Sequence, residues 1–166
     1  MKKNFNFLTW AFAALMLVVT SACGDDDDIP PKPEKETTAT IVYAVPALYD
    51  LADIADVKIS YKGADGKMIE KAITESPVSF TIEKVKIPFE AKMTINATKK
   101  AGFTPTKDKY DLGKGFGIAA ELSTGTIIAG PSAAIQKGLK AEFIDKYLST
   151  NFPKEYKKDI VDPYEK

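Results

Sequence analysis

Three aspartates that recur every third residue are the first candidates for chemistry: Asp50, Asp53 and Asp56. Hard cations such as Ca²⁺ bind several carboxylate and carbonyl oxygens at once, so a calcium loop is one interpretation. The spacing does not follow the EF-hand pattern, and the segment contains no glycine for a sharp turn. The preferred interpretation is a solvated loop or short helical turn that binds no metal or cofactor.

A second candidate is the glycine-rich segment Gly113-Lys114-Gly115-Phe116-Gly117. A phosphate-binding loop of this kind follows a strand and opens a helix. Here the glycines lead instead into an apolar alternation over Phe116, Ile118, Ala120 and Leu122, which is typical of a strand. A turn followed by a strand is therefore expected.

The residue types that are missing restrict the chemistry further. The chain has no histidine, all 23 of its basic residues are lysine, and Cys23 is its only cysteine. Histidine-based acid–base catalysis, Ser-His triads, imidazole metal sites and bidentate arginine recognition are excluded. Paired carboxylates can hydrolyse glycosides, but no spacing singles out one pair among 23 acidic residues. We expect no catalytic residue and no enzyme, with a carboxylate hydrolase as a distant third alternative.

The N-terminal 22 residues have the layout of a secretory signal peptide. Lys2 and Lys3 precede an apolar stretch, Leu8 to Val19, and small residues follow before Cys23. The stretch is shorter than the roughly 20 apolar residues of a membrane-spanning helix. A lone thiol directly after a small-residue site indicates an attachment point; an ordinary signal peptide or an uncleaved anchor is the alternative.

This junction resembles a known class of proteins. The segment Val19-Thr20-Ser21-Ala22-Cys23 resembles the lipobox of bacterial lipoproteins, with Thr20 in place of the usual leucine. The acidic run Asp25 to Asp28 resembles the export signal that sends lipoproteins of the Bacteroidota to the outer face of the outer membrane. The resemblance implies that Cys23 becomes the mature N-terminus, carries a diacylglycerol and an amide-linked acyl chain such as palmitate, and anchors the protein at the cell surface.

Charge and aromatic content limit the possible ligands. Without residues 1–22 the chain has 21 lysines and 23 acidic residues, so nucleic acid is not an expected partner. Trp10, the only tryptophan, lies in the leader, so sugar stacking would rest on tyrosine or phenylalanine. The tyrosines that could form a binding face are Tyr43, Tyr49, Tyr61, Tyr110, Tyr147, Tyr156 and Tyr164. Tyr43 and Tyr61 fall on the apolar side of predicted strands, which favours the core.

Period-two alternation dominates residues 38–130. Apolar side chains alternate with polar ones around Ile41, Ile59, Phe80 and Met93, and Asp65-Gly66 marks a hairpin turn. About six short strands, each with one wet face, predict an antiparallel β-sandwich. We expect an immunoglobulin-like arrangement, with a transthyretin-like sandwich as the alternative. The predicted core includes Ile59, Phe80, Met93, Ile95 and Ile118.

The flanking segments have other patterns. Residues 23–37 mix charge with proline and predict a lipidated, extended tether. Residues 131–150 place Ile135, Leu139, Phe143 and Tyr147 four apart, which predicts a C-terminal amphipathic helix. Residues 151–166 are expected to form a partly ordered tail.

The expected function is a lipid-anchored binding or accessory module at the outer membrane, which captures a glycan, a peptide or a membrane partner. The alternative is a structural component of a fimbria-like or envelope assembly, in which exposed strand edges accept a strand from a partner.

Overall fold

The computed structural model describes residues 36–130 and 134–164. These residues belong to one compact unit, Lys35–Lys166. Cys23 and the predicted signal peptide and tether lie outside the described residues, apart from Glu36 and Thr37.

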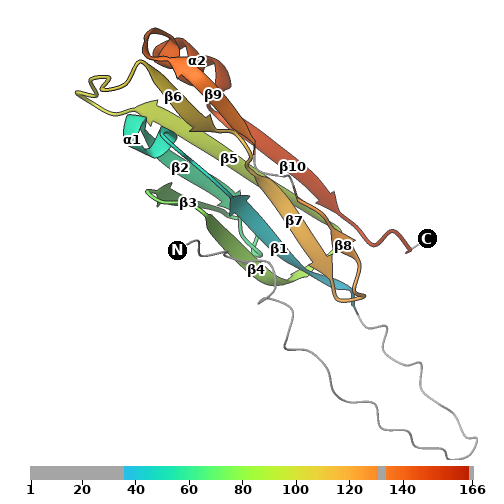
Figure 1. Cartoon of the computed structure of the whole chain (residues 1–166). Coiled ribbons are helices and arrows are strands. Elements are labelled where there is room, and N and C mark those ends of the chain that lie inside the picture. The colour runs from blue at the N-terminus through green and yellow to red at the C-terminus, as the bar shows by residue number, and fades with distance from the viewer. Residues whose placement is uncertain (1–35, 131–133, 165–166) are drawn as a thin grey trace, which may run out of the picture. The chain divides into compact units, whose positions relative to one another are not determined.

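Two four-stranded antiparallel sheets pack face to face, as Figure 1 shows. One sheet has the strand order β4-β1-β7-β8 and the other β10-β5-β2-β3, while β6 and β9 form a separate two-stranded ribbon. The strands are β1 (Thr38–Val45), β2 (Ala55–Lys62), β3 (Met68–Ile73), β4 (Val78–Lys86), β5 (Phe89–Lys99), β6 (Lys109–Gly113), β7 (Gly117–Leu122), β8 (Ile127–Ile128), β9 (Ile135–Lys140) and β10 (Lys154–Ile160). The helices are α1 (Leu51–Ile54), a 3₁₀ turn (Ala141–Phe143) and α2 (Ile144–Asn151). The prediction of a mainly β, antiparallel sandwich is confirmed.

The core forms where the inward sides of the strands meet. Alternate residues of β1 and β5 are buried, as expected for strands with one wet face. Tyr43 of β1 and Tyr61 of β2 pack against each other with ring centroids 5.0 Å apart, and both are buried. Four of the predicted core residues are buried: Ile59, Met93, Ile95 and Ile118. Phe80 is only half-buried, because β4 is the last strand of its sheet.

The predicted hairpin is present between β2 and β3. Gly66 adopts a φ of 81°, which is costly for residues with a Cβ, and the Gly63 N–H donates to the Lys67 carbonyl at 2.8 Å.

The immunoglobulin-like strand order is not the one observed. That fold places its first, second, fifth and fourth strands in one sheet. Here β1 pairs with β4 and β7, and β2 pairs with β3 and β5. The physical reason lies between Ala47 and Ile54: the chain makes a turn and the short helix α1, which carry it from one sheet to the other.

The C-terminal helix is shorter than expected. Of the predicted range 131–150, residues 135–140 form strand β9, and the α-helix begins only at Ile144. Gly138 has a φ of 62°, which a right-handed helix excludes, and Leu139 pairs with Tyr110 of β6 instead. Within α2 the apolar side does face the core, with Ile144, Tyr147 and Leu148 buried.

The expectation of a partly ordered tail at 151–166 was also wrong for most of that segment. Residues 154–160 form strand β10, which pairs with β5 along its whole length from Lys154↔Ile95 to Ile160↔Phe89. The strand supplies an outer neighbour to β5. The high charge of β10 conceals the apolar alternation that would predict a strand. Its inward positions are Tyr156, Lys158 and Ile160, and one of these is a lysine.

Candidate functional site

The anchoring residue predicted from the sequence, Cys23, lies outside the described residues, as do Asp25 to Asp28. The described chain begins beside β4: the Lys86 Nζ lies 2.7 Å from Glu36 Oε2. Whatever precedes Glu36 therefore joins the sandwich at the C-terminal end of β4. No helix among the described residues combines the length and the apolar character needed to cross a membrane.

The three aspartates of the candidate calcium loop do not converge on one point. Asp50 precedes α1, Asp53 lies on the exposed side of that helix, and Asp56 lies on the exposed side of β2. Across residues 36–130 and 134–164, no group of three or more His, Cys, Asp or Glu side chains is arranged to hold a metal ion.

Asp50 instead connects segments that are far apart in the sequence through hydrogen bonds to Lys107 and Asp111, which together we call the Asp50 bracket. Its carboxylate accepts hydrogen bonds from Lys107 Nζ and from the backbone N–H of Asp111, both at 2.8 Å. Its own N–H donates to the Asp111 carbonyl at 2.9 Å. The hydrogen bond from Lys107, followed by that from the Asp111 backbone, holds the pKa of Asp50 below its usual value.

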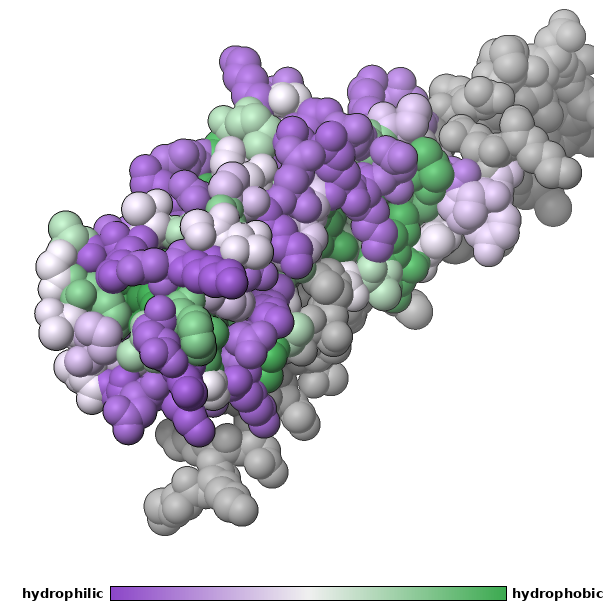
Figure 2. Space-filling model, turned by 90° about the horizontal axis from the view of Figure 1, so that it is seen from above, coloured by the Kyte–Doolittle hydropathy of each residue, from purple (hydrophilic) through white to green (hydrophobic). Residues whose placement is uncertain are grey.

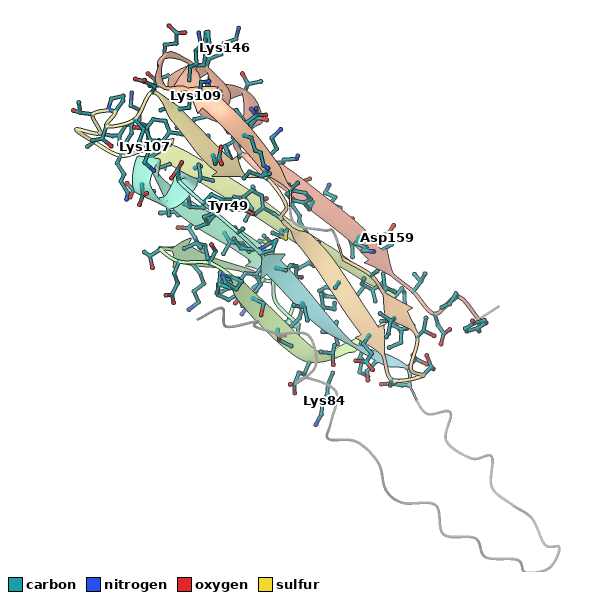
Figure 3. All side chains as sticks on the ribbon, in the orientation of Figure 1. Tyr49, Lys84, Lys107, Lys109, Lys146 and Asp159 are labelled. Atoms are coloured by element: carbon teal, nitrogen blue, oxygen red, sulfur yellow. The ribbon has the colours of Figure 1, made fainter. Side chains whose placement is uncertain are left out.

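The bracket extends to the β6–β9 ribbon. The Asp111 Oδ1 accepts a hydrogen bond from the backbone N–H of Gly138 at 2.8 Å. The Tyr110 hydroxyl accepts from the backbone N–H groups of Thr106 and Lys107 at 2.8 and 3.1 Å. Sequence reasoning missed this network, since its members come from three separate segments and carry no common motif. Figure 3 shows Lys107 beside α1, with Tyr49 farther in along the sandwich.

The glycine-rich segment is a turn between β6 and β7, as predicted, with Phe116 just ahead of the strand rather than in it. Two backbone N–H groups at the start of this turn already have partners within the chain. Those of Gly113 and Lys114 donate to the carbonyls of Leu48 and Ala134, at 3.0 and 2.8 Å. A Cβ at Gly113 would clash with the Ala47 carbonyl oxygen, so this glycine permits a close backbone approach.

The tyrosines do not form a common binding face. Tyr43, Tyr61, Tyr110 and Tyr147 are buried, and burial raises the pKa of Tyr43 to about 12. Tyr49 and Tyr164 are 51% and 81% exposed. Tyr49 forms a bridge with Leu112 of β6, whereas Tyr164 lies four residues beyond Ile160, the β10 residue that pairs with Phe89. They cannot stack on one small sugar.

Charge is mixed at the end of the sandwich that carries α2. Figure 2 views this end, where hydrophilic side chains predominate and apolar ones show between them. Lys99 is paired with Asp145 at 2.8 Å, and Lys107 with Asp50. Because the lysines alternate with carboxylates, this end is not a uniformly positive surface.

The two four-stranded sheets have four edge strands, and three of these are poorly suited to pairing. β8 has only two residues. β10 has the sequence Lys-Glu-Tyr-Lys-Lys-Asp-Ile, and β3 carries Glu70 and Lys71 at its centre. Short or charged edge strands are the devices by which proteins avoid adding further strands.

The fourth edge strand, β4, has its charged residues and a bulge only in its second half, from Glu83 to Lys86, and we call its uncharged first half, Val78–Ile82, the β4 edge. It reads Val-Ser-Phe-Thr-Ile, has no charge, and has half-buried Val78, Phe80 and Ile82 on its inward side. Its pairing ends at a bulge, since Ala39 pairs with Val85 while Ile41 pairs with Ile82. Lys84 in this bulge has a φ of 54° and projects from the end of β4 in Figure 3.

The direction of the backbone groups at the β4 edge follows from its neighbours. The Thr38 carbonyl accepts from Ser123 N–H at 2.7 Å, so Thr38 faces the β7 side of β1. Peptide groups alternate along a strand, so Tyr43 faces β4, where it pairs with Phe80. The N–H and C=O groups of Ser79 and Thr81 therefore point outward from the sheet, available to another strand.

Comparisons with known proteins give no family for this chain. No protein-family model matches it. No curated protein matches it in sequence either.

Proposed function

We propose that the chain is a lipid-anchored binding module of the cell envelope, held in the outer membrane by acyl chains on Cys23 and facing the cell surface. The small residues before Cys23 and the acidic run Asp25 to Asp28 support this. Each buried CH₂ of an acyl chain contributes about 0.8 kcal/mol, and two or more chains hold a protein firmly. The proposal assigns no catalytic step to the chain.

The strand order supports the transthyretin-like alternative for the type of sandwich. In that arrangement the first strand lies inside its sheet, between the fourth and the seventh, and the second strand lies in the facing sheet. β1 has these neighbours here, and β2 pairs with β3 and β5.

The ligand of the module is an extended protein segment that adds to the β4 edge as a further strand. The observation that carries this is the outward N–H and C=O groups of Ser79 and Thr81 on the uncharged stretch Val78–Ile82 of β4. In strand addition, main-chain hydrogen bonds supply affinity and alternate side chains supply specificity. The inward side of the β4 edge offers Val78, Phe80 and Ile82 as apolar contacts. A glycan fits less well, because the two exposed tyrosines do not lie together: Tyr49 is beside β6 and Tyr164 follows β10.

The same edge favours a second candidate function, a structural component of a fimbria-like or envelope assembly. Both functions use strand addition, and they differ in whether the added strand belongs to a ligand or to a neighbouring subunit.

The anchor is tested by metabolic labelling with a clickable fatty acid. Wild-type protein should be labelled and Cys23→Ala should not; equal labelling of both would refute lipidation at this residue. Changing Asp25 to Asp28 to alanine should leave the protein acylated but protected from protease added to intact cells. If the alanine variant is cleaved as readily as the parent, the acidic run is only a spacer.

The binding edge is tested by photo-crosslinking in intact cells. A photoreactive amino acid at Thr81 should form protein adducts on illumination, and the same group at Thr124, an exposed threonine in the turn before β8, should not. Adducts at neither position, or at both equally, would rule out the β4 edge as the binding site.

A further inference from the structure

We propose that the strand added to the β4 edge comes from a second copy of this chain, so that two copies pair antiparallel about Phe80. The inference rests on the proposed function and names the partner of the same edge. The result is a continuous sheet in which each copy contributes β4-β1-β7-β8.

The order of side chains along the β4 edge is nearly the same in both directions. In an antiparallel pair centred on Phe80, Val78 faces Ile82 of the second copy, Ser79 faces Thr81, and the two Phe80 side chains face each other. A two-fold symmetric interface requires a surface that is complementary to itself. Aromatic, β-branched and hydroxyl pairs placed opposite each other are the cross-strand pairs that stabilise sheets.

The backbone groups are compatible with this pairing. Ser79 and Thr81 both point their N–H and C=O groups outward, as derived above from the Thr38–Ser123 and Tyr43–Phe80 pairings. In the centred register each Ser79 N–H donates to the Thr81 carbonyl of the second copy, and each Thr81 N–H to the Ser79 carbonyl. A slip of one residue would place inward apolar residues opposite outward hydroxyl residues, so the register is specified.

Charges at the ends of the edge also complement each other. Beyond Ile82 the bulge carries Lys84, which in this register comes opposite Ser76 of the second copy, next to Glu75. Lys84 and Glu75 are both exposed. Opposite charges at the rim of an interface favour encounter and register more than affinity.

When both copies are anchored to one membrane, a contact as short as Val78–Ile82 is sufficient to hold the two copies together. Lipid anchors confine both copies to one surface, which raises their effective concentration. Glu36 lies beside Lys86, six residues from Phe80, so the two Glu36 positions would be about 40 Å apart along the paired strands. The segment from Cys23 to Glu36 spans at most about 45 Å when extended. Both anchors can therefore reach the same membrane.

The test uses the full-length chain on intact cells, with Ser79→Cys and Thr81→Cys combined. Directly opposed residues of a hydrogen-bonded pair have Cα atoms about 5.5 Å apart, within the range of a disulfide. A mild oxidant should convert this variant to a dimer that reduction dissociates. The wild type, with Cys23 alone, should remain monomeric. The matched control is Lys157→Cys with Asp159→Cys, which has the same spacing on the exposed side of the β10 edge and should not cross-link.

A second measurement does not depend on cysteine. Two copies with different tags, co-expressed and solubilised in mild detergent, should co-purify, and Thr81→Lys should lower the yield about tenfold because it places charge at the pairing edge. Thr124→Lys, which adds the same charge away from β4, should leave the yield unchanged.

The outcomes separate this inference from the proposed function. Photo-adducts at Thr81 with a different protein, together with no disulfide dimer and no co-purification, would overturn the self-pairing and leave the binding edge in place. No adduct of any kind at Thr81 would overturn both. Equal cross-linking at β4 and β10 would show collision on the membrane and overturn the self-pairing.

Discussion

Asp50→Ala tests how much the bracket between α1 and β6 stabilises the sandwich. The substitution leaves the Asp111 N–H, which now donates to the carboxylate at 2.8 Å, without its acceptor. The Asp50 side chain is only 22% exposed, so water replaces that acceptor incompletely. A polar group left without a partner costs about 1–3 kcal/mol, and we expect a loss of about 2 kcal/mol in the free energy of unfolding. For a domain of this size, the melting temperature should fall by roughly 6–10 °C.

Asp50→Asn is the matched control. It keeps an oxygen acceptor for the Asp111 N–H and removes only the charge that faces Lys107. That ion pair is exposed and screened on the Lys107 side, so the effect should be much smaller than that of alanine. Urea unfolding followed by circular dichroism measures all three proteins. If Asp50→Ala is as stable as the wild type, or Asp50→Asn loses as much stability as Asp50→Ala, the hydrogen bond from the Asp111 N–H to Asp50 does not stabilise the fold.

The lowered pKa of Asp50 determines how the stability of the fold changes with pH. A carboxyl whose pKa is lower in the folded than in the unfolded state stabilises the fold above the unfolded pKa, which is about 3.9. That contribution is lost as the pH falls through the folded pKa. The stability difference between wild type and Asp50→Asn should therefore be present at pH 7 and shrink below about pH 4. A difference that grows on acidification would contradict this assignment.

Four further predictions follow from the core, two backbone positions and the aspartates. Met93→Asp should unfold the sandwich, because an unpaired charge at a fully buried position costs several kcal/mol; unchanged melting would place Met93 outside the core. Gly113→Ala should lower the free energy of unfolding by more than about 2 kcal/mol through its clash with the Ala47 carbonyl, whereas a variant of normal stability would mean that this turn relaxes freely. Lys84→Gly should raise stability by about 0.5–1 kcal/mol in urea unfolding, since glycine adopts a φ of 54° without strain, and a loss would show that the lysine stem contributes to packing. Calorimetry with calcium should give no submillimolar binding, and binding that disappears in Asp53→Ala would restore the calcium loop.

Local alternation was enough to predict the main strands of both sheets. Each of β1, β2, β4, β5 and β7 has apolar residues at every second position, and burial follows that pattern. The Asp65-Gly66 turn was predicted for the same reason, because its conformational requirement is local.

The segments that were mispredicted depend on distant partners. Ile135 and Leu139 are four residues apart, which fits a helix, yet both lie on β9 because β6 offers a pairing edge and Gly138 takes a left-handed conformation. β10 is a strand because β5 lies beside it, and the charges along β10 concealed this.

The exposed position of the β4 edge also depends on distant partners and could not be predicted from local sequence. That Val78–Ile82 forms a strand was predicted, but its position at the margin of a sheet depends on the order of strands. The order is fixed by contacts such as Tyr43–Phe80 and Tyr43–Ile118, between residues that are far apart along the chain. The Asp50 bracket likewise joins residues 61 positions apart.

The place of β10 has a consequence for biosynthesis. It is the last strand along the chain, and it covers the edge of β5 from Phe89 to Ile95. Until Lys154–Ile160 have been made, β5 has no outer neighbour and the inward row of Ala91, Met93 and Ile95 lacks the shielding that Tyr156 and Ile160 give. Pairing between distant segments is slow, and domains fold as units during synthesis. The β5 edge and the apolar row beside it are therefore covered last, after the segments of the other strands have been made.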